Sequence, residues 1–239
     1  MTVKENLEGK QRLNRYGVKG ILIWYLMIFG CLLALLICSG KLDWLNAWVF
    51  FMVSMAYQTI SVIIMIKTCP EMLNERGKFA KKGTKPFDKI FIVLWMPVNL
   101  LSMAIMAWDA VRFQWSYMPF WILILGVILT IPGFSLGLWA MLSNPYFELT
   151  VRIQEDRDHR VISSGPYKLI RHPGYTGEII MLLATPLMLG SFWGYVPTGG
   201  VILLLIVRTA LEDRTLRKEL PGYEEYSNKT RHRLFPYIW

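Results

Sequence analysis

Ionisable side chains beside apolar runs are the residues of this chain best suited to do chemistry. Arg208 and Glu212 stand four residues apart at the end of the last apolar run, so they share one face of a helix. An ionisable group there is costly unless it is paired or faces a cavity. The two residues are therefore interpreted as an interfacial ion pair or as part of a site. Their neighbours Asp213 and Arg214 are expected on a solvated surface.

A second candidate site is the basic and aromatic segment 171–175, with the sequence RHPGY. Its proline suits the first turn of a helix, and a helix N-terminus offers free N–H groups and positive potential to an anion. Tyr167 and Tyr175 belong to an interfacial aromatic belt or pack against a flat or cationic ligand. Glu178, one turn into the next apolar run, is either an interfacial carboxylate or a group that lines the site.

These residues must be positioned by membrane helices. The chain has 239 residues, of which 54% are hydrophobic and 18% charged, whereas about a quarter of the residues of a soluble protein are charged. Because a bilayer needs about 20 apolar residues per helix, we predict a single all-α integral membrane domain over 1–239. It is a polytopic bundle of about six transmembrane helices that ends in a helical hairpin. The expected spans are 20–39, 44–66, 90–110, 117–142, 174–192 and 195–211.

The positive charges predict the orientation of this bundle. With six spans, all of the 26 Lys and Arg residues except Lys41 and Arg112 fall on one side of the membrane. Such an asymmetry marks the cytosolic side, so the protein is expected to be multi-pass with both termini in the cytosol. Residues 1–19 are polar and lead into a full-length span, which predicts an uncleaved anchor. The net charge of +9 is attributed to loops that face anionic lipid, not to nucleic-acid binding.

Several common catalytic motifs are missing from the sequence. It has no GxG, HExxH or GxSxG, and its three cysteines form no CxxC pair. These absences disfavour soluble dinucleotide enzymes, P-loop ATPases, zinc proteases and serine hydrolases. The three histidines have no metal-ligand spacing, so no metal is expected.

The C-terminal part of the chain, 143–239, resembles the isoprenylcysteine carboxyl methyltransferase family and its phospholipid methyltransferase relatives. The matching motifs occur in the family's order: HRVI at 159–162, GPY at 165–167, RHPGY at 171–175, Arg208 with Glu212 and Asp213, and GYEEY at 222–226 followed by RLFP and Trp239. Residues 1–142 resemble the family only as a four-helix apolar part. Two departures are mild: Asp213 replaces a frequent second glutamate, and Val161 replaces an expected leucine.

The resemblance implies a cofactor and a site. Members of the family use S-adenosylmethionine without a soluble Rossmann domain, in a cytosolic pocket over the helix bundle, and a lipophilic substrate enters from the bilayer lipids. Arg208 would bind the polar end of the substrate and, with Glu212, would form the catalytic pair. The residues that would contact the cofactor are Gln154, His159, Arg160, Val161, Ile162, Tyr167, His172, Pro173, Gly174, Tyr175 and Glu212.

The methyl acceptor remains open between several chemistries. A carboxylate, as in isoprenylcysteine carboxyl O-methylation, is the first expectation, because the guanidinium fork of Arg208 binds two oxygens at once. A phospholipid amine or a small thiol is the alternative and would need a base, for which Glu178 and Tyr175 are candidates. Two interpretations of another class are also open. One is a sterol-type reductase that uses NADPH, because such enzymes share a similar tail and hairpin. The other is a membrane protein without catalysis.

Overall fold

The computed structural model of this protein describes residues 12–78 and 81–239. Within these ranges the chain forms helices and loops and no strand, which confirms the predicted all-α class. The elements are α1 (Arg15–Ser39), α2 (Leu45–Thr68), α3 (Pro70–Arg76), α4 (Pro86–Ala107), the π-helical η1 (Trp108–Arg112), α5 (Phe120–Ser143), the 3-10 turns η2 (Glu155–Arg157) and η3 (Gly165–Lys168), α6 (Pro173–Leu189), α7 (Tyr195–Glu219) and α8 (Tyr223–Lys229).

Local sequence signals fix the ends of several helices. The side chain of Asn14 caps α1 by accepting hydrogen bonds from the next backbone N–H groups. Gly40 ends α1 and Gly190 ends α6, each with a positive φ that a glycine adopts without strain. The short α3 lies between the second and third predicted spans, and Pro70 at its first position favours this extra helix.

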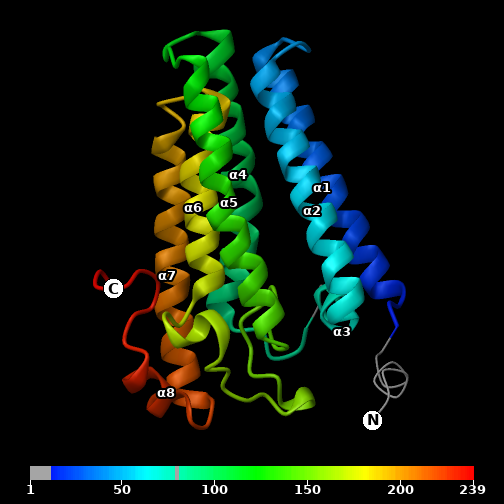
Figure 1. Ribbon diagram of the computed structural model, residues 1–239, viewed down its shortest axis with the longest axis vertical. Coiled ribbons are helices and arrows are strands. Elements are labelled where there is room, and N and C mark those ends of the chain that lie inside the picture. The colour runs from blue at the N-terminus through cyan, green and yellow to red at the C-terminus, as the bar shows by residue number, and fades with distance from the viewer. Residues whose placement is uncertain (1–11, 79–80) are drawn as a thin grey trace.

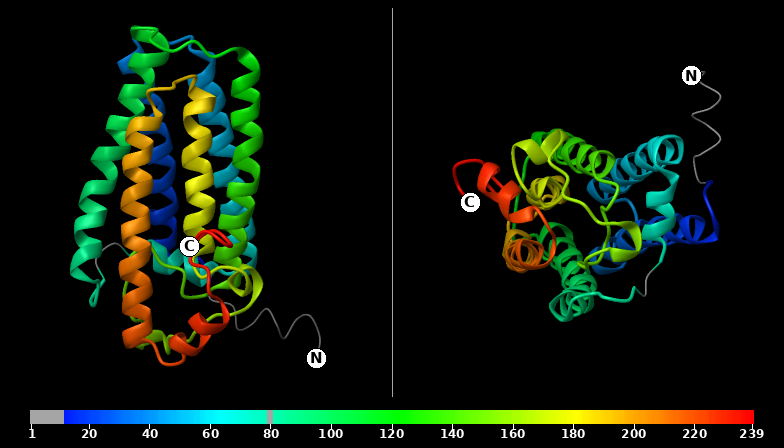
Figure 2. Two further views of the ribbon diagram at one scale, coloured as in Figure 1. Left: turned by 90° about the vertical axis from the view of Figure 1, so that its left-hand side faces the viewer. Right: turned by 90° about the horizontal axis from the view of Figure 1, so that it is seen from below.

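The long helices run side by side along the long axis of the molecule (Figure 1). The hairpin of α1 and α2 lies on one side, and α4, α5, α6 and α7 form the other (Figure 2). The start of α1, α3, the loop 144–172 and α8 all gather at one end of the bundle (Figure 1). The segments that carry most of the positive charge therefore lie together, as the charge pattern predicts.

In the part of the chain that the structure describes, five helical segments are long and apolar enough to cross a membrane: α1, α2, α4 with η1, α5 and α7. The sixth predicted run forms α6, which has 17 residues and is shorter than the roughly 20 residues of a typical span. Within residues 12–78 and 81–239, five helices are thus long and apolar enough for a span, and a shorter helix stands where the sequence predicts the fifth of about six. The predicted hairpin of the last two runs is present as α6 and α7.

The last long helix extends well beyond its predicted end at residue 211. Residues 212–219 continue α7 because they include good helix formers, and Arg217 and Lys218 favour its negative C-terminal end. The extension carries Asp213 into the end of the bundle that holds the loop and the tail. The position of this carboxylate matters for the site described below.

Glycines allow α5 and α6 to approach closely. A Cβ atom added to Gly177 would lie 2.6 Å from the carbonyl oxygen of Gly133 and 2.9 Å from the backbone nitrogen of Gly137. Small residues allow such backbone contact between membrane helices. The contact fixes α6 against α5 just below the first turn of α6.

We expect Gly177→Ala to lower the thermal unfolding temperature of the protein in detergent. The added methyl group meets backbone atoms that have no rotamer to change, and overpacking of this kind costs about 1–3 kcal/mol. Gly199→Ala on α7 is the matched control, because a Cβ there meets nothing within 4 Å. Equal unfolding temperatures for the two variants would show that the α5–α6 contact is not tight.

Candidate active site

The segment 171–175 is bound to the C-terminal tail through its backbone. The N–H of Arg171 donates to the carbonyl of His232 at 3.0 Å, and the N–H of His172 donates to that of Arg233 at 2.9 Å. Helix α6 begins at Pro173, which confirms the predicted helix start. Loop, helix start and tail thus form one unit at the end of the bundle.

Tyr175 joins the two predicted catalytic residues. Its hydroxyl donates a hydrogen bond of 2.6 Å to Oε2 of Glu212. Its ring centre lies 5.3 Å from the guanidinium carbon of Arg208, and its ring is nearly parallel to that of His172 at 5.8 Å. The structure therefore brings four of the predicted residues together between the first turn of α6 and the end of α7.

Arg208 forms its ion pair with Asp88, not with Glu212. Its Nε lies 2.8 Å from Oδ1 of Asp88, and Nη2 donates to the carbonyl of Leu149 at 2.6 Å. The ring of Phe91 covers its guanidinium at 4.4 Å. The interpretation of Arg208 and Glu212 as an ion pair is therefore wrong: the i, i+4 spacing gives them one helix face, but Arg208 turns to α4 and Glu212 to Tyr175.

Asp88 is a residue that the sequence analysis missed. It is fully buried in the first turn of α4, and Oδ2 accepts from the N–H of Val151 at 2.7 Å. One carboxylate thus connects α4, α7 and the loop 144–172. The available signal was an acid in the first turn of a helix that begins with a proline, which indicates a helix start but no partner.

The carboxylate of Asp213 is buried, so the prediction of a solvated surface for this residue is wrong. It accepts from Nε and Nη2 of Arg171 at 2.7 and 3.1 Å and from Nε of Arg233 at 3.0 Å. The hydroxyl of Tyr223 donates to it at 3.1 Å, and Arg217 lies 3.4 Å away. From the sequence, Asp213 is expected to be exposed on α7. In the structure it is buried, because the tail and α8 fold over it.

A second group of predicted residues lies in the loop itself. The buried Gln154 donates to the carbonyl of Tyr146 at 2.7 Å and accepts from Arg157 at 2.8 Å. Nδ1 of His159 accepts from the N–H of Gln154 at 3.4 Å, and burial lowers the pKa of His159. A neutral imidazole is the form that accepts this bond, so loop geometry and charge state agree.

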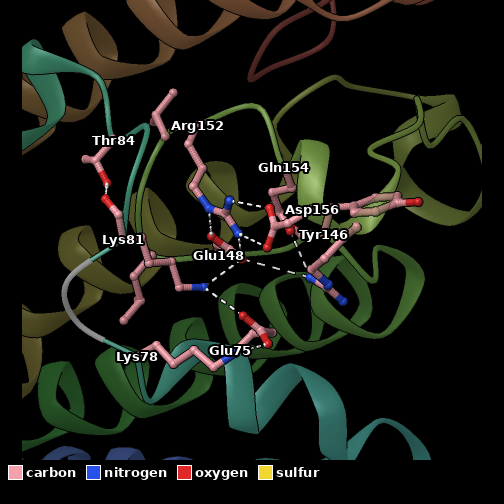
Figure 3. Close-up of polar contacts among 12 residues, drawn as sticks. Glu75, Lys78, Lys81, Thr84, Tyr146, Glu148, Arg152, Gln154 and Asp156 are labelled. Carbon is pink, nitrogen blue, oxygen red and sulfur yellow. Dashed lines mark hydrogen bonds and ion pairs between the residues drawn. The ribbon is translucent and has the colours of Figure 1, made fainter.

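Buried charges around Glu148 hold this loop in place (Figure 3). Glu148 binds Lys81 at 2.6 Å and Nε of Arg152 at 3.0 Å, and Arg152 also binds Asp156 at 2.6 Å. Burial lowers the pKa of Arg152, but the bonds to the two acids raise it above its usual value. Lys81 also forms an ion pair with Glu75 of α3, with 3.3 Å between Nζ and Oε2. The network ties the loop to the segment that follows α2.

The remaining predicted residues divide into packed and exposed ones. Val161, Ile162 and Tyr167 pack with aromatic residues of α8, and the carbonyl of Tyr167 accepts from Tyr226 at 2.7 Å. Burial raises the pKa of Tyr167 above its usual range. Arg160 is exposed and pairs with Asp158. These residues build the wall of the loop next to the tail.

Gly174 completes the site through its lack of a side chain. A Cβ there would lie 2.7 Å from the ring of Phe147, so this ring rests directly on the start of α6. Phe147 also packs with the residues around Tyr167. It thereby connects the helix start with the aromatic wall of the loop.

The carboxylate of Glu212 and the aromatic ring of Tyr175 suit a cationic ligand that carries hydroxyl groups. In residues 12–78 and 81–239, no cation forms an ion pair with Glu212, which is hydrogen-bonded to Tyr175, and the ring of Tyr175 packs against that of His172. A carboxylate accepts from hydroxyl groups, and aromatic faces attract a cation such as a sulfonium. In the same ranges, no group of three or more His, Cys, Asp or Glu residues gathers as for a metal ion.

Fold and site define the class of this protein as a polytopic helical membrane protein with its polar side chains gathered at one end of the bundle. Residues 121–221 match the family model described as phospholipid methyltransferase. A relative from Oryza sativa subsp. indica, described as a probable protein-S-isoprenylcysteine O-methyltransferase, is 33% identical over 99 residues. The match covers 38% of this chain and 49% of the relative. A relative of the same description from Oryza sativa subsp. japonica has the same values.

These matches agree with the resemblance that the sequence motifs indicate. Residues 121–221 are similar to the phospholipid methyltransferase family model, and 99 residues are similar to relatives described as probable protein-S-isoprenylcysteine O-methyltransferases. The chain spans about half the length of the relatives it matches. The matched residues include α5, the loop, α6 and α7, and therefore all the predicted site residues.

Proposed function

We propose that this protein is a membrane methyltransferase that uses S-adenosylmethionine to methylate a lipophilic acceptor, with a carboxylate as the first candidate. The observation that carries the proposal is the cluster of Tyr175, Glu212 and Arg208 at the mouth of the α6–α7 hairpin. It lies in the part of the chain that matches the methyltransferase family. The end of the bundle that holds the cluster faces the cytosol, as the concentration of positive charge there supports.

The residues present would hold the cofactor through complementary contacts. Glu212 would accept hydrogen bonds from its hydroxyl groups, while Tyr175 fixes the orientation of this carboxylate. His159 to Ile162, with Gln154, Arg160 and Tyr167, would form the loop side of the pocket, and His172 to Gly174 the helix side. When bound, S-adenosylmethionine supplies an electrophilic methyl group on a sulfonium.

A carboxylate acceptor needs no base. Its oxygen forms the new O–C bond as the S–C bond breaks, and that electron pair stays on sulfur, so the products are a methyl ester and a neutral thioether. The protein's task is to hold the reacting atoms about 3–3.5 Å apart and in line. Arg208 has N–H donors beyond those used by Asp88 and Leu149, and these would orient the acceptor's oxygens.

An amine acceptor is the second candidate, because the matching family model is that of a phospholipid methyltransferase. A protonated amine or a thiol must lose a proton before it attacks. Glu178 lies three residues after Tyr175 on α6 and would serve as the base. Products of methyl transfer from an isotopically labelled donor to a prenylated cysteine, a phosphatidylethanolamine and an alkyl thiol distinguish these acceptors.

We expect Glu212→Gln to weaken binding of S-adenosylmethionine at least tenfold, since a hydrogen bond to a charged group contributes about 1.5–3 kcal/mol. Isothermal titration of the purified protein measures the effect. Glu225→Gln on α8 is the control, because this exposed carboxylate pairs with Lys229 alone among the described residues. Unchanged affinity in Glu212→Gln would remove Glu212 from the cofactor site.

Thermal stabilisation of the wild-type protein tests the proposal as a whole. A ligand that binds the folded state raises the unfolding temperature by mass action. We expect S-adenosylmethionine and its demethylated product to do so, and NADPH not to. Stabilisation by NADPH alone would favour the sterol-type reductase, and stabilisation by none of them would favour a protein without this catalysis.

A further inference from the structure

A pocket lies away from the α6–α7 hairpin, between α1, α2, α3 and α5. Its volume is about 140 Å³, room for four or five waters at about 30 Å³ each. Apolar side chains such as Ile21, Val62 and Met65 form much of its wall. Its polar and aromatic members are Trp24, Tyr57, Gln58, Ser61 and Arg76.

Arg76 is a cation without a carboxylate partner in this pocket. Its guanidinium lies 5.7 Å from the ring centre of Trp24 and 5.5 Å from that of Phe147, and Nη1 donates to the sulfur of Met141 at 3.2 Å. Across residues 12–78 and 81–239, no acid forms an ion pair with it. Glu75, next to it in sequence, binds Lys78 and Lys81 instead.

An arginine in this state has unused binding capacity. Burial lowers the pKa of Arg76, while Tyr57 and Glu178 raise it, yet an arginine stays protonated in proteins. A sulfur atom is a weak acceptor, so most of its N–H groups lack a strong partner. A charge in a low-dielectric site gains much from a hydrogen-bonded counter-ion. The natural counter-ion for a planar guanidinium is an oxyanion, carboxylate or phosphate.

Ser61 points to the same ligand independently. Ser61 is 4% exposed, and among the described residues its hydroxyl has no hydrogen-bond partner in good geometry, although the hydroxyl of Tyr57 lies near it in the same pocket. Buried hydroxyl groups in native proteins nearly always have one. A hydroxyl that lines the pocket with Arg76 would donate to the same oxyanion.

The pocket is connected to the proposed methyl-transfer site through one aromatic ring. The guanidinium carbon of Arg76 lies 5.5 Å from the ring centre of Phe147. Gly174 at the start of α6 packs against the same ring. A group bound at Arg76 would thus lie one side chain away from the predicted cofactor segment. The apolar wall between α1 and α2 would accommodate the first atoms of a hydrocarbon chain.

We propose that Arg76 and Ser61 bind the oxyanionic head group of a membrane amphiphile in this pocket. The assignment rests on the proposed function where it identifies this amphiphile as the methyl acceptor. It adds a recognition residue from α3, a part of the chain outside the family match. Arg76 would bind the carboxylate of the acceptor as it enters, which selects acidic amphiphiles over neutral ones, and Arg208 would orient the same carboxylate once it reaches the cofactor.

Binding to the purified full-length protein in a non-ionic detergent tests this site. The probes are N-acetyl-S-farnesylcysteine with a free carboxylate, its neutral methyl ester, and dodecyl phosphate. We expect an acidic probe to bind wild type at least tenfold more tightly than the ester. Arg76→Gln should remove this preference, while affinity for S-adenosylmethionine stays within about twofold. Arg15→Gln is the control, because this arginine is exposed and lies at the start of α1, at the same end of the bundle as α3.

The two anionic probes distinguish the sources of the head group. Carboxylate binding that depends on Arg76 supports the acceptor assignment. Phosphate binding alone with the same dependence supports the oxyanion site but overturns its role for a carboxylate acceptor. Equal affinity of the wild type and a folded Arg76→Gln for both probes overturns the site. If Arg76→Gln does not fold, Arg76→Lys and Ser61→Ala are used, each with an expected loss of at least threefold, and unchanged affinity in both overturns the site.

The same variants separate this inference from the proposed function. Methyl transfer with an unchanged KM in Arg76→Gln would leave a methyltransferase without this pocket. Binding that depends on Arg76 in a protein that transfers no methyl group would leave the pocket without the enzyme. We expect KM for a carboxylate acceptor to rise at least tenfold and kcat to change little.

Discussion

Asp213→Asn is expected to destabilise the protein more than any other single isosteric change at this end of the bundle. The substitution keeps the shape of the side chain and removes the charge that Arg171 and Arg233 share. The side chains of Asp213 and Arg171 are 1% and 2% exposed, so water does not replace the lost partner. Breaking a buried ion pair from one side costs about 3–5 kcal/mol.

The damage should extend to the cofactor segment. Arg171 also donates to the carbonyls of Thr230 and Arg231 at 2.8 and 2.9 Å, so it holds the tail against the start of α6 while Asp213 holds Arg171. Loss of this carboxylate is therefore expected to free the tail and to weaken cofactor binding. Thermal unfolding in detergent and limited proteolysis of the tail measure the two effects.

A matched control separates burial from charge. Asp158→Asn also removes a carboxylate that pairs with an arginine, Arg160, but there the two side chains are 80% and 75% exposed. We expect little change in the unfolding temperature, because exposed pairs are screened by water. If Asp158→Asn and Asp213→Asn shift the unfolding temperature equally, the network around Asp213 does not support the tail.

The sequence was sufficient for the helices and for the cluster of motifs. Hydropathy located every long helix, since a run of apolar residues in a membrane protein must satisfy its backbone hydrogen bonds internally. RHPGY located the start of α6 because a proline in the first helical position is a local signal. Local signals of this kind do not depend on the rest of the fold.

The partners of buried charges could not be predicted in the same way. Arg208 and Asp88 are 120 residues apart, and Arg171 and Asp213 are 42 apart. Helical spacing shows which residues share a face but not which helix packs against that face, so Glu212 was a plausible partner for Arg208. The burial of Asp213 likewise follows from α8 and the tail, whose position no local pattern encodes.

Arg208→Ala is expected to reduce methyl transfer about 100- to 1000-fold, the loss found when a group that orients the reacting atoms or stabilises their charge is removed. Cofactor affinity should stay within about threefold, because Glu212 and the loop provide those contacts. Asp88 would keep its bond from Val151 but lose its cation. Arg214→Ala, exposed six residues further along α7, is the control.

The Arg208→Lys variant shows whether this arginine contacts the acceptor or only holds the structure, when its kcat/KM is measured with a carboxylate acceptor and with a thiol acceptor. Lysine keeps a charge beside Asp88 but lacks the planar fork that binds two oxygens. A role at the carboxylate predicts near-wild-type unfolding, a large loss of kcat/KM for a carboxylate acceptor and a small loss for a thiol. An equal loss for both acceptors would mean that Arg208 acts by positioning α4 and the loop through Asp88 and Leu149. The acceptor's polar end would then be recognised elsewhere, and Arg76, which lines a pocket and has donors left, is the candidate for it.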